Sequence, residues 1–211
     1  AEVYLPEEDR TSYYAYIQDE WQFVQNWQLT SGIRYDKYSD FGETVNPRLA
    51  LIWATTDTVT TKWLYGRAFR APSFIELFAI SNPVVLGNKN LRPETIDTYE
   101  MAISHQPIYD LRYSVNVFYY KIKDFIAFVP GVTGNVAQNV GERSALGGEF
   151  EIEYSMGREF RVLGNYATQR AVDDRTDKRV GEAPNHQIYG RVEWRFMPNY
   201  QFATQANWVG K

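Results

Sequence analysis

The segment Tyr65–Glu100 (YGRAFRAPSFIELFAISNPVVLGNKNLRPETIDTYE) joins two runs in which aromatic and polar residues alternate. It is too long for the tight turn of a β-hairpin. Ser73 and Glu76 have the spacing of a capping box, which predicts a short helix over about 73–79. Pro93 favours extended backbone in the residue before it, so a strand is expected to resume there. The segment therefore predicts a structured loop between two strands.

Period-two alternation dominates the rest of the chain, and helical periodicity is nearly absent. Trp27–Tyr38 is the clearest case, because Trp27, Leu29 and Ile33 share one face while polar residues share the other. By this rule we expect about ten strands. They cover residues 12–23, 27–38, 47–54, 60–70, 95–105, 111–128, 144–155, 160–169, 186–196 and 201–208.

The expected connections between these strands alternate between short and long. Such a regular asymmetry is typical of membrane β-barrels, which have short turns at one end and longer loops at the other. A soluble β-sandwich has no reason to separate its loops in this way, although alternation by itself fits both folds. The short connections are expected at 24–26, 55–59, 107–110, 156–159 and 197–200, and the longer ones at 37–46, 71–94, 129–143 and 170–185.

Composition narrows the class of protein further. The 211 residues suffice for one large β-domain, and no run of about 18 apolar residues could form a transmembrane helix. The mean hydropathy of -0.46 is compatible with strands that alternate lipid-facing and water-facing residues. Aromatic residues make up 16% of the chain, which suits the aromatic girdles of such barrels. The net charge of -4 and the lack of a basic stripe argue against nucleic acid as a partner.

Several short motifs follow one another in a fixed order along the chain. In this order they resemble the TonB-dependent outer-membrane receptors, and four pieces together make the resemblance specific where any single one would be weak. The pieces are GIRYD (32–36), NPRLA (46–50), GRAFRAPS (66–73) with GN (87–88), LRPET (91–95) and YE (99–100), and NVGE (139–142) with GGEFE (147–151).

The resemblance implies an all-β fold, an antiparallel transmembrane β-barrel in the outer membrane of a Gram-negative bacterium. Barrels of this family have roughly 22 strands closed around an N-terminal plug, so about ten strands form only part of one. We therefore expect residues 1–211 to be a segment of the barrel, with the plug domain, the TonB box and the terminal aromatic strand outside it. The start of the chain has no signal peptide, which agrees with a segment that begins inside a longer protein. Alone, such a segment would expose its sheet edges and aggregate.

The resemblance also implies active uptake of a large nutrient. A ligand would bind the extracellular loops, and the TonB inner-membrane complex would act through the missing plug. The expected cargo is a ferric siderophore, with cobalamin next, and the other expected partner is outer-membrane lipid. No reaction, cofactor or metal is expected: the chain has no Cys for a zinc site and no GxSxG elbow. The alternatives are a passive porin or structural barrel, a barrel enzyme and a soluble sugar-binding sandwich.

Candidate ligand-binding residues lie in and beside the long loop. Arg67 and Arg70 could face the channel and attract an anionic ferric chelate, but ion pairing with Glu94 or Glu100 is the favoured alternative. Phe74 and Phe78 could stack on an aromatic chelator, and here packing within the loop is favoured. On the strand at 144–155, a row of acids calls for water or a partner such as Arg143, Arg191 or Arg195. The ligand-binding candidates are Arg67, Arg70, Phe74, Glu76, Phe78, Asn88 and Arg92.

Overall fold

The computed structural model describes residues 4–82, 84–132, 134–180 and 184–210, and it consists almost entirely of strands. No helix in these ranges is long and apolar enough to cross a membrane. The elements are β1 (Ser12–Val24), β2 (Trp27–Tyr38), β3 (Gly42–Ala54), β4 (Val59–Arg70), α1 (Phe74–Phe78), β5 (Val85–Leu86), β6 (Glu94–Ile108), β7 (Leu111–Lys123), β8 (Ile126–Pro130), β9 (Asn135–Asn139), β10 (Arg143–Met156), β11 (Phe160–Asp173), β12 (Lys178–Arg179), β13 (His186–Met197) and β14 (Tyr200–Gly210).

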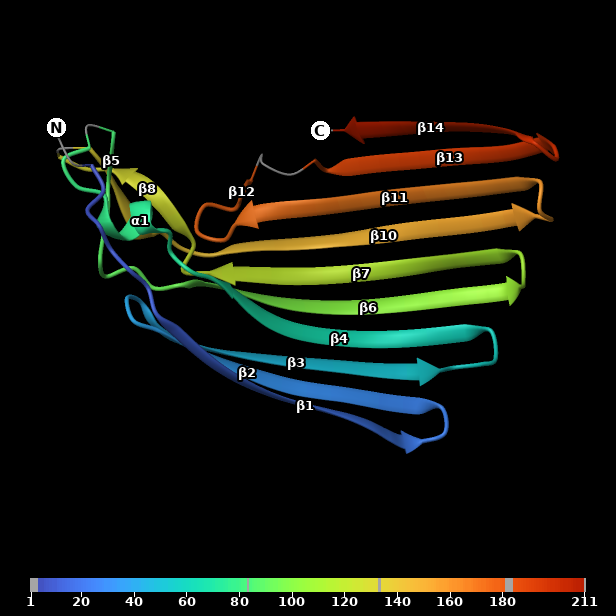
Figure 1. Cartoon of the computed structure of the whole chain (residues 1–211), viewed down its shortest axis with the longest axis horizontal. Coiled ribbons are helices and arrows are strands. Elements are labelled where there is room, and N and C mark those ends of the chain that lie inside the picture. The colour runs from blue at the N-terminus through green and yellow to red at the C-terminus, as the bar shows by residue number, and fades with distance from the viewer. Residues whose placement is uncertain (1–3, 83, 133, 181–183, 211) are drawn as a thin grey trace.

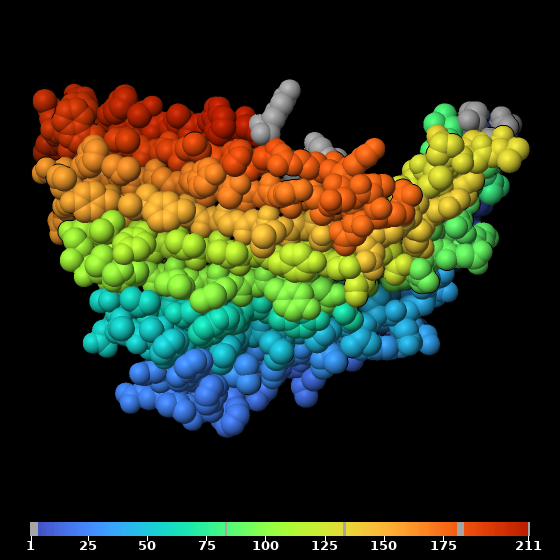
Figure 2. Space-filling model, turned by 180° about the vertical axis from the view of Figure 1, so that it is seen from behind, coloured from blue at the N-terminus to red at the C-terminus, as the bar shows by residue number. Residues whose placement is uncertain are grey.

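The long strands form one antiparallel sheet in which each strand pairs with the next long strand along the chain (Figure 1). The order is β1-β2-β3-β4-β6-β7-β10-β11-β13-β14, and the short β12 pairs with β11 beside this path. A second, small sheet has the order β5-β9-β8. It stands with α1 at the end of the large sheet opposite the turns that join β1 to β2, β3 to β4, β6 to β7, β10 to β11 and β13 to β14, and the space-filling view from behind shows the same arrangement (Figure 2).

One face of the large sheet, which we call the aromatic face, carries stacked rings. The Trp27 ring lies 5.0 Å from that of Trp53 and 6.1 Å from that of Trp63, with the planes nearly parallel. Nearer the other end of the strands, the Tyr65 and Tyr99 rings lie 5.0 Å apart. The strand register puts all of these side chains on the same face, as period-two alternation requires.

The opposite face, which we call the charged face, carries a row of ion pairs. Glu153 on β10 contacts Arg112 on β7 at 3.4 Å and Arg161 on β11 at 2.6 Å. Arg161 reaches Glu193 on β13 at 4.0 Å, and Glu193 binds Arg191 at 2.6 Å. Of the acids on β10, Glu153 is therefore neutralised, by Arg112 and Arg161, whereas Glu151 accepts a hydrogen bond from Asn165 at 3.4 Å. The expected partners Arg143, Arg191 and Arg195 were wrong for this residue.

The ten long strands were predicted in number and order, and most bounds agree within a few residues. Two expectations were wrong. The link 37–46 was expected to be long, but β3 begins at Gly42, so the link 39–41 is no longer than the link 55–58. The strand expected at 111–128 ends at Lys123, because Asp124 adopts a positive φ of 55° and turns the chain into β8. The other long connections remain at the end that carries α1.

Gly147 on β10 is a point of close contact within the charged face. A Cβ there would meet the Phe118 ring of β7 and would lie 2.7 Å from the Thr168 carbonyl oxygen of β11. A Cβ at Gly66, on the same face, would meet nothing within 4 Å. Gly147 therefore leaves the space that the aromatic ring of the neighbouring strand fills.

We predict that Gly147→Ala destabilises the full-length protein by about 1–3 kcal/mol, because the ring and the backbone must move apart. Gly66→Ala is the matched control and should be neutral or slightly stabilising. The thermal unfolding midpoint in detergent measures both. Equal midpoints for the two variants would show that the ring moves away without cost.

Candidate ligand-binding lobe

The described residues of 71–93 and 124–142, two loops far apart in the sequence, fold together into one unit that we call the lobe. β5 from the first loop pairs in parallel with β9 from the second, and β9 pairs with β8. The lobe rises from the end of the sheet near the N-terminus (Figure 1). Because each loop supplies one side of this small sheet, neither would adopt this structure alone.

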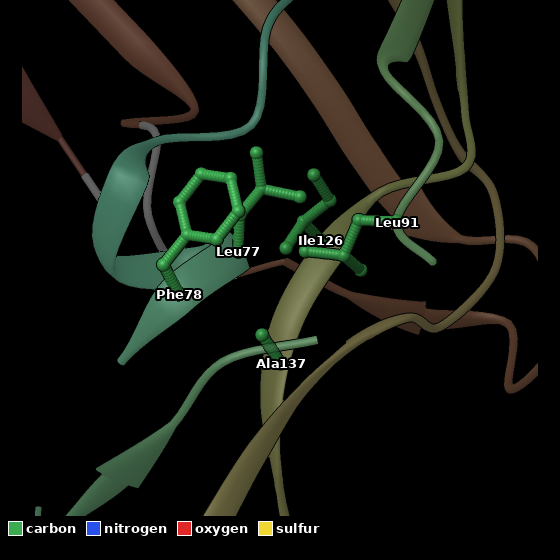
Figure 3. Close-up of a cluster of buried hydrophobic side chains, with 5 residues drawn as sticks. All are labelled: Leu77, Phe78, Leu91, Ile126 and Ala137. Carbon is green, nitrogen blue, oxygen red and sulfur yellow. The ribbon is translucent and has the colours of Figure 1, made fainter. Parts of the chain in front are cut away.

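Apolar side chains from both loops form the core of the lobe, as Figure 3 shows. Leu77 and Ala137 are 1% and 0% exposed, although they come from different loops. Phe78 is buried in the same cluster, and Phe74 packs against it. The cluster consists of Leu77, Phe78, Leu91, Ile126 and Ala137. The predicted packing role of the two phenylalanines is thus observed, and their rings help to hold the lobe together.

Arg70 joins the sheet to the lobe through two carboxylates. Its guanidinium donates to Glu94 at 2.7 and 2.8 Å and to Glu76 at 3.0 and 3.1 Å. Glu94, 8% exposed, also accepts the backbone N–H of Ile126 at 2.7 Å. Such charge-assisted, paired contacts are the strong hydrogen bonds of proteins. The alternative of ion pairing, predicted for Arg70 with Glu94, is what the structure shows.

The helix α1 begins and ends as its sequence predicts. Ser73 accepts from the Glu76 backbone N–H, and the Glu76 carboxylate accepts from the Ser73 N–H at 2.7 Å, which completes the capping box. After the helix, the Gly87 N–H donates to Ala79 and the Asn88 N–H donates to Glu76, both at 2.8 Å. A Cβ at Gly87 would lie 2.6 Å from backbone atoms of this helix, so only glycine fits here.

The segment before β1 lies against the lobe and fastens it to the sheet. The Tyr4 carbonyl accepts from the Ile80 N–H at 2.9 Å. Arg10 donates to Asp40 and to the Pro72 carbonyl, both at 2.7 Å. The Arg10 guanidinium also lies over the ring of Phe74, 4.9 Å from its centroid. Sequence reasoning missed Arg10, because nothing near it in the sequence indicates these distant partners.

Two further candidates, Asn88 and Arg92, connect the loops to each other. The Asn88 side-chain amide donates to the Ala137 carbonyl at 3.1 Å. The Arg92 N–H donates to the Asn139 side chain at 2.9 Å, and its guanidinium contacts Asp124 at 2.5 Å. The Arg92 side chain is nevertheless 71% exposed. Among the candidate residues, its charged side chain is more exposed than those of Arg67 and Arg70, which are 37% and 45% exposed.

Arg67 lies apart from the other candidates. Its register partner on β6 is Asp97, and both lie on the aromatic face with Tyr65. Arg67 binds Asp97 at 2.8 Å, and the Tyr65 hydroxyl donates to the same carboxylate at 2.9 Å. The expectation that Arg67 and Arg70 face the channel together was wrong, since an odd spacing places them on opposite faces. The ion partner is Asp97 and not Glu94 or Glu100.

The described residues contain no group of three or more His, Cys, Asp or Glu that could hold a metal ion. The lobe presents exposed cations, backbone groups and apolar side chains to solvent. Exposed Lys89 lies 3.7 Å from Glu8 and close to the Phe78 ring, on the same loop as Arg92.

Comparison with known proteins agrees with this architecture. Residues 2–211 match the family described as TonB dependent receptor-like, beta-barrel. The chain belongs to this family of TonB-dependent receptor barrels. The sheet is therefore part of a barrel wall in the bacterial outer membrane, and a soluble sugar-binding sandwich is excluded. In such barrels the outward face is apolar with aromatic girdles, and the polar face lines the interior.

Relatives with this barrel domain include named transporters. The vitamin B12 transporter BtuB of Vibrio cholerae is 29% identical over 147 residues, which are 70% of this chain and 23% of BtuB. The ferric enterobactin receptor of Pseudomonas aeruginosa is 22% identical over 93% of this chain and 30% of its own length.

Solved structures share the fold of the barrel segment. A variant of the Pseudomonas aeruginosa ferric enterobactin receptor in complex with enterobactin superposes with a TM-score of 0.82 at 20% identity, over 95% of this chain and 33% of the receptor. The siderophore receptor PirA of the same organism gives 0.80 at 20% identity, over 95% and 38%. The chain thus spans about a third of these receptors. The family consists of transport receptors and not of enzymes.

Glu76 makes the lobe sensitive to acid. Partial burial alone would raise the pKa of its carboxyl, but hydrogen bonds from Arg70 and Ser73 outweigh this and lower the pKa below its usual 4.5. A carboxyl with a lowered pKa in the folded state stabilises that state above its unfolded pKa. This stabilisation is lost as pH falls through the lowered value.

We predict that the lobe loosens as pH falls below about 4.5, and that Glu76→Gln weakens this pH dependence while loosening the lobe at neutral pH. Hydrogen exchange of the amides in 71–93, measured on the full-length protein in detergent, reports the change. Glu159→Gln, in the exposed link between β10 and β11, is the control. An unchanged pH profile in Glu76→Gln would contradict the assignment.

Proposed function

We propose that this chain is the wall and loop segment of an outer-membrane receptor that takes up a ferric siderophore actively, driven by the TonB complex. The observation that carries the proposal is the combination of a charged inner face with a rigid lobe at one end of the strands. A wet interior offers a path for polar cargo, and a preformed lobe offers a binding surface without a large ordering cost.

The nature of the cargo follows from the charges on the lobe. Arg92 and Lys89 lie on one loop with side chains 71% and 70% exposed, and each contacts a carboxylate, Asp124 and Glu8 respectively. An anionic chelate can replace these carboxylates as a partner of the two cations, which a neutral compound cannot do. Relatives named as ferric enterobactin and siderophore receptors support the same class. Cobalamin is kept as the second candidate, because the chain is 29% identical to the vitamin B12 transporter BtuB and 22% identical to the ferric enterobactin receptor.

Coupling to TonB belongs to the parts of the protein beyond this segment. We propose that residues 1–211 are one segment of the barrel, that a plug domain elsewhere in the protein contacts TonB, and that the protein catalyses no reaction. The family match supports a receptor over a passive porin, because its members are TonB-dependent.

Transport assays on cells that carry the full-length gene test the function. We expect uptake of radiolabelled ferric enterobactin under iron limitation, abolished by deletion of the gene or of the TonB complex. Labelled cobalamin is the parallel substrate. Uptake that persists without TonB would indicate a passive porin, and uptake of cobalamin alone would overturn the choice of cargo.

For the lobe, we predict that Arg92→Gln weakens binding of ferric enterobactin to the full-length protein roughly tenfold, because one charge-assisted contact is lost. Thermal stability should change little, since exposed ion pairs contribute little. Lys178→Gln in the exposed β12 is the matched control and should bind normally. Equal affinities for the two variants would remove Arg92 from the binding surface.

A further inference from the structure

A second cluster of polar side chains lies on the charged face of β1–β3, away from the row of ion pairs on β7–β13. It surrounds a hollow of about 220 Å³. Its two cations, Arg34 and Arg48, belong to the GIRYD and NPRLA motifs respectively, which lie outside the lobe. The polar residues that line the hollow are Tyr16, Gln18, Arg34, Asn46 and Arg48.

Arg48 has unusual space around it. Its register partners are Gly32 on β2 and Gly66 on β4, so no side chain stands directly beside it on either strand. The Arg48 Cγ lies 3.2 Å from the position that a Cβ of Gly32 would occupy, which means that the stem lies over bare backbone. In the described ranges, Arg48 has no ion pair or side-chain hydrogen bond. Its planar group of N–H donors is therefore free.

Arg34 is held rigidly beside this free cation. It binds Asp36 through three hydrogen bonds of 2.7–3.0 Å, and Asp36 is only 1% exposed. The Arg34 guanidinium also lies over the Tyr14 ring, 4.4 Å from its centroid. Asp36 thus balances the charge of Arg34 and leaves the charge of Arg48 uncompensated. An exposed guanidinium beside a neutral pair is suited to bind an anion.

Asn46 adds a second requirement for whatever enters the hollow. Its side-chain N–H₂ donates to Thr44 at 3.1 Å and to Asp36 at 3.4 Å, whereas its Oδ1 is buried and has no partner. A buried acceptor without a partner is costly. An occupant that carries oxyanion oxygens as well as a hydroxyl would accept hydrogen bonds from Arg48 and donate one to Asn46 Oδ1.

We propose that this hollow is an oxyanion-binding site on the interior wall, with Arg48 as its anchor. A carboxylate from an acidic side chain elsewhere in the same protein would bind Arg48 alone. An anionic cargo that also carries a hydroxyl would bind Arg48 and donate to Asn46 Oδ1 on its way through the barrel. The second source rests on the proposed function, whereas the site itself does not. Gln18 and Tyr16 supply further polar groups at its edge.

The experiment uses the full-length protein in detergent with inorganic phosphate as the probe, at neutral pH, where it carries both oxyanion oxygens and a P–OH group. The readout is the thermal unfolding midpoint in phosphate relative to sodium chloride of equal ionic strength. Because phosphate stabilises proteins in general, each variant is compared with wild type in the same buffer. The variants are Arg48→Gln, Arg48→Lys and the control Lys37→Gln, which removes an exposed cation from the other face of β2.

We expect phosphate to raise the wild-type and Lys37→Gln midpoints more than that of Arg48→Gln, with at least about tenfold weaker phosphate binding in Arg48→Gln. Arg48→Lys should retain part of the effect, because lysine keeps the charge but not the planar fork. If Arg48→Gln has a lower midpoint than Lys37→Gln, Arg48→Lys restores part of it and phosphate shifts all variants equally, the occupant is an acid of the same protein. A lower midpoint that Arg48→Lys does not restore would show lost packing and no oxyanion site. If neither midpoint nor phosphate response distinguishes Arg48→Gln from Lys37→Gln, the site does not exist. None of these readouts requires transport, so a failed uptake assay would leave them intact.

Discussion

Backbone hydrogen bonding between neighbouring strands is the constraint on which the whole structure depends. In hydrocarbon every N–H and C=O must find a partner within the protein, and an antiparallel sheet provides one along each strand. This pairing fixes the register, and the register then sends alternate side chains to opposite faces. The stacked tryptophans on one side and the Arg112–Glu153–Arg161 row on the other are consequences of that geometry.

The lobe obeys a different rule, because it is stabilised by side chains and not by long ladders. Its small sheet has only short strands, and its core joins Leu77 to Ile126 and Ala137 across two loops. Arg70, at the end of β4, and Glu94, at the start of β6, form an ion pair at the junction. The second loop joins them through the Ile126 backbone N–H, which donates to Glu94. A rigid lobe of this kind keeps its exposed groups in place before a ligand arrives, which lowers the cost of binding.

Most of the candidate binding residues make contacts that hold the lobe together. Phe78 fills the core, Glu76 caps the helix, and Asn88 holds the second loop. Their residue types are those expected of a binding site. Side chains that contact other parts of the lobe support the binding surface from beneath and leave little of themselves for a ligand to contact. Arg92 also has an internal partner, Asp124, but its side chain stays 71% exposed. Arg48, which has no such partner among the described residues, lies in the NPRLA motif outside the lobe.

The sequence by itself determined the ten long strands, the two faces of strands such as β2 and the capped helix, because alternation and capping depend on residues that are close in the chain. It also determined the family, through motifs in a fixed order. Only the tertiary structure decided that Asp97 pairs with Arg67, that the segment at Arg10 fastens the lobe, and that two loops form one body. These contacts join residues about 30 to 60 positions apart, and the strand register brings such residues together without leaving any local pattern in the sequence.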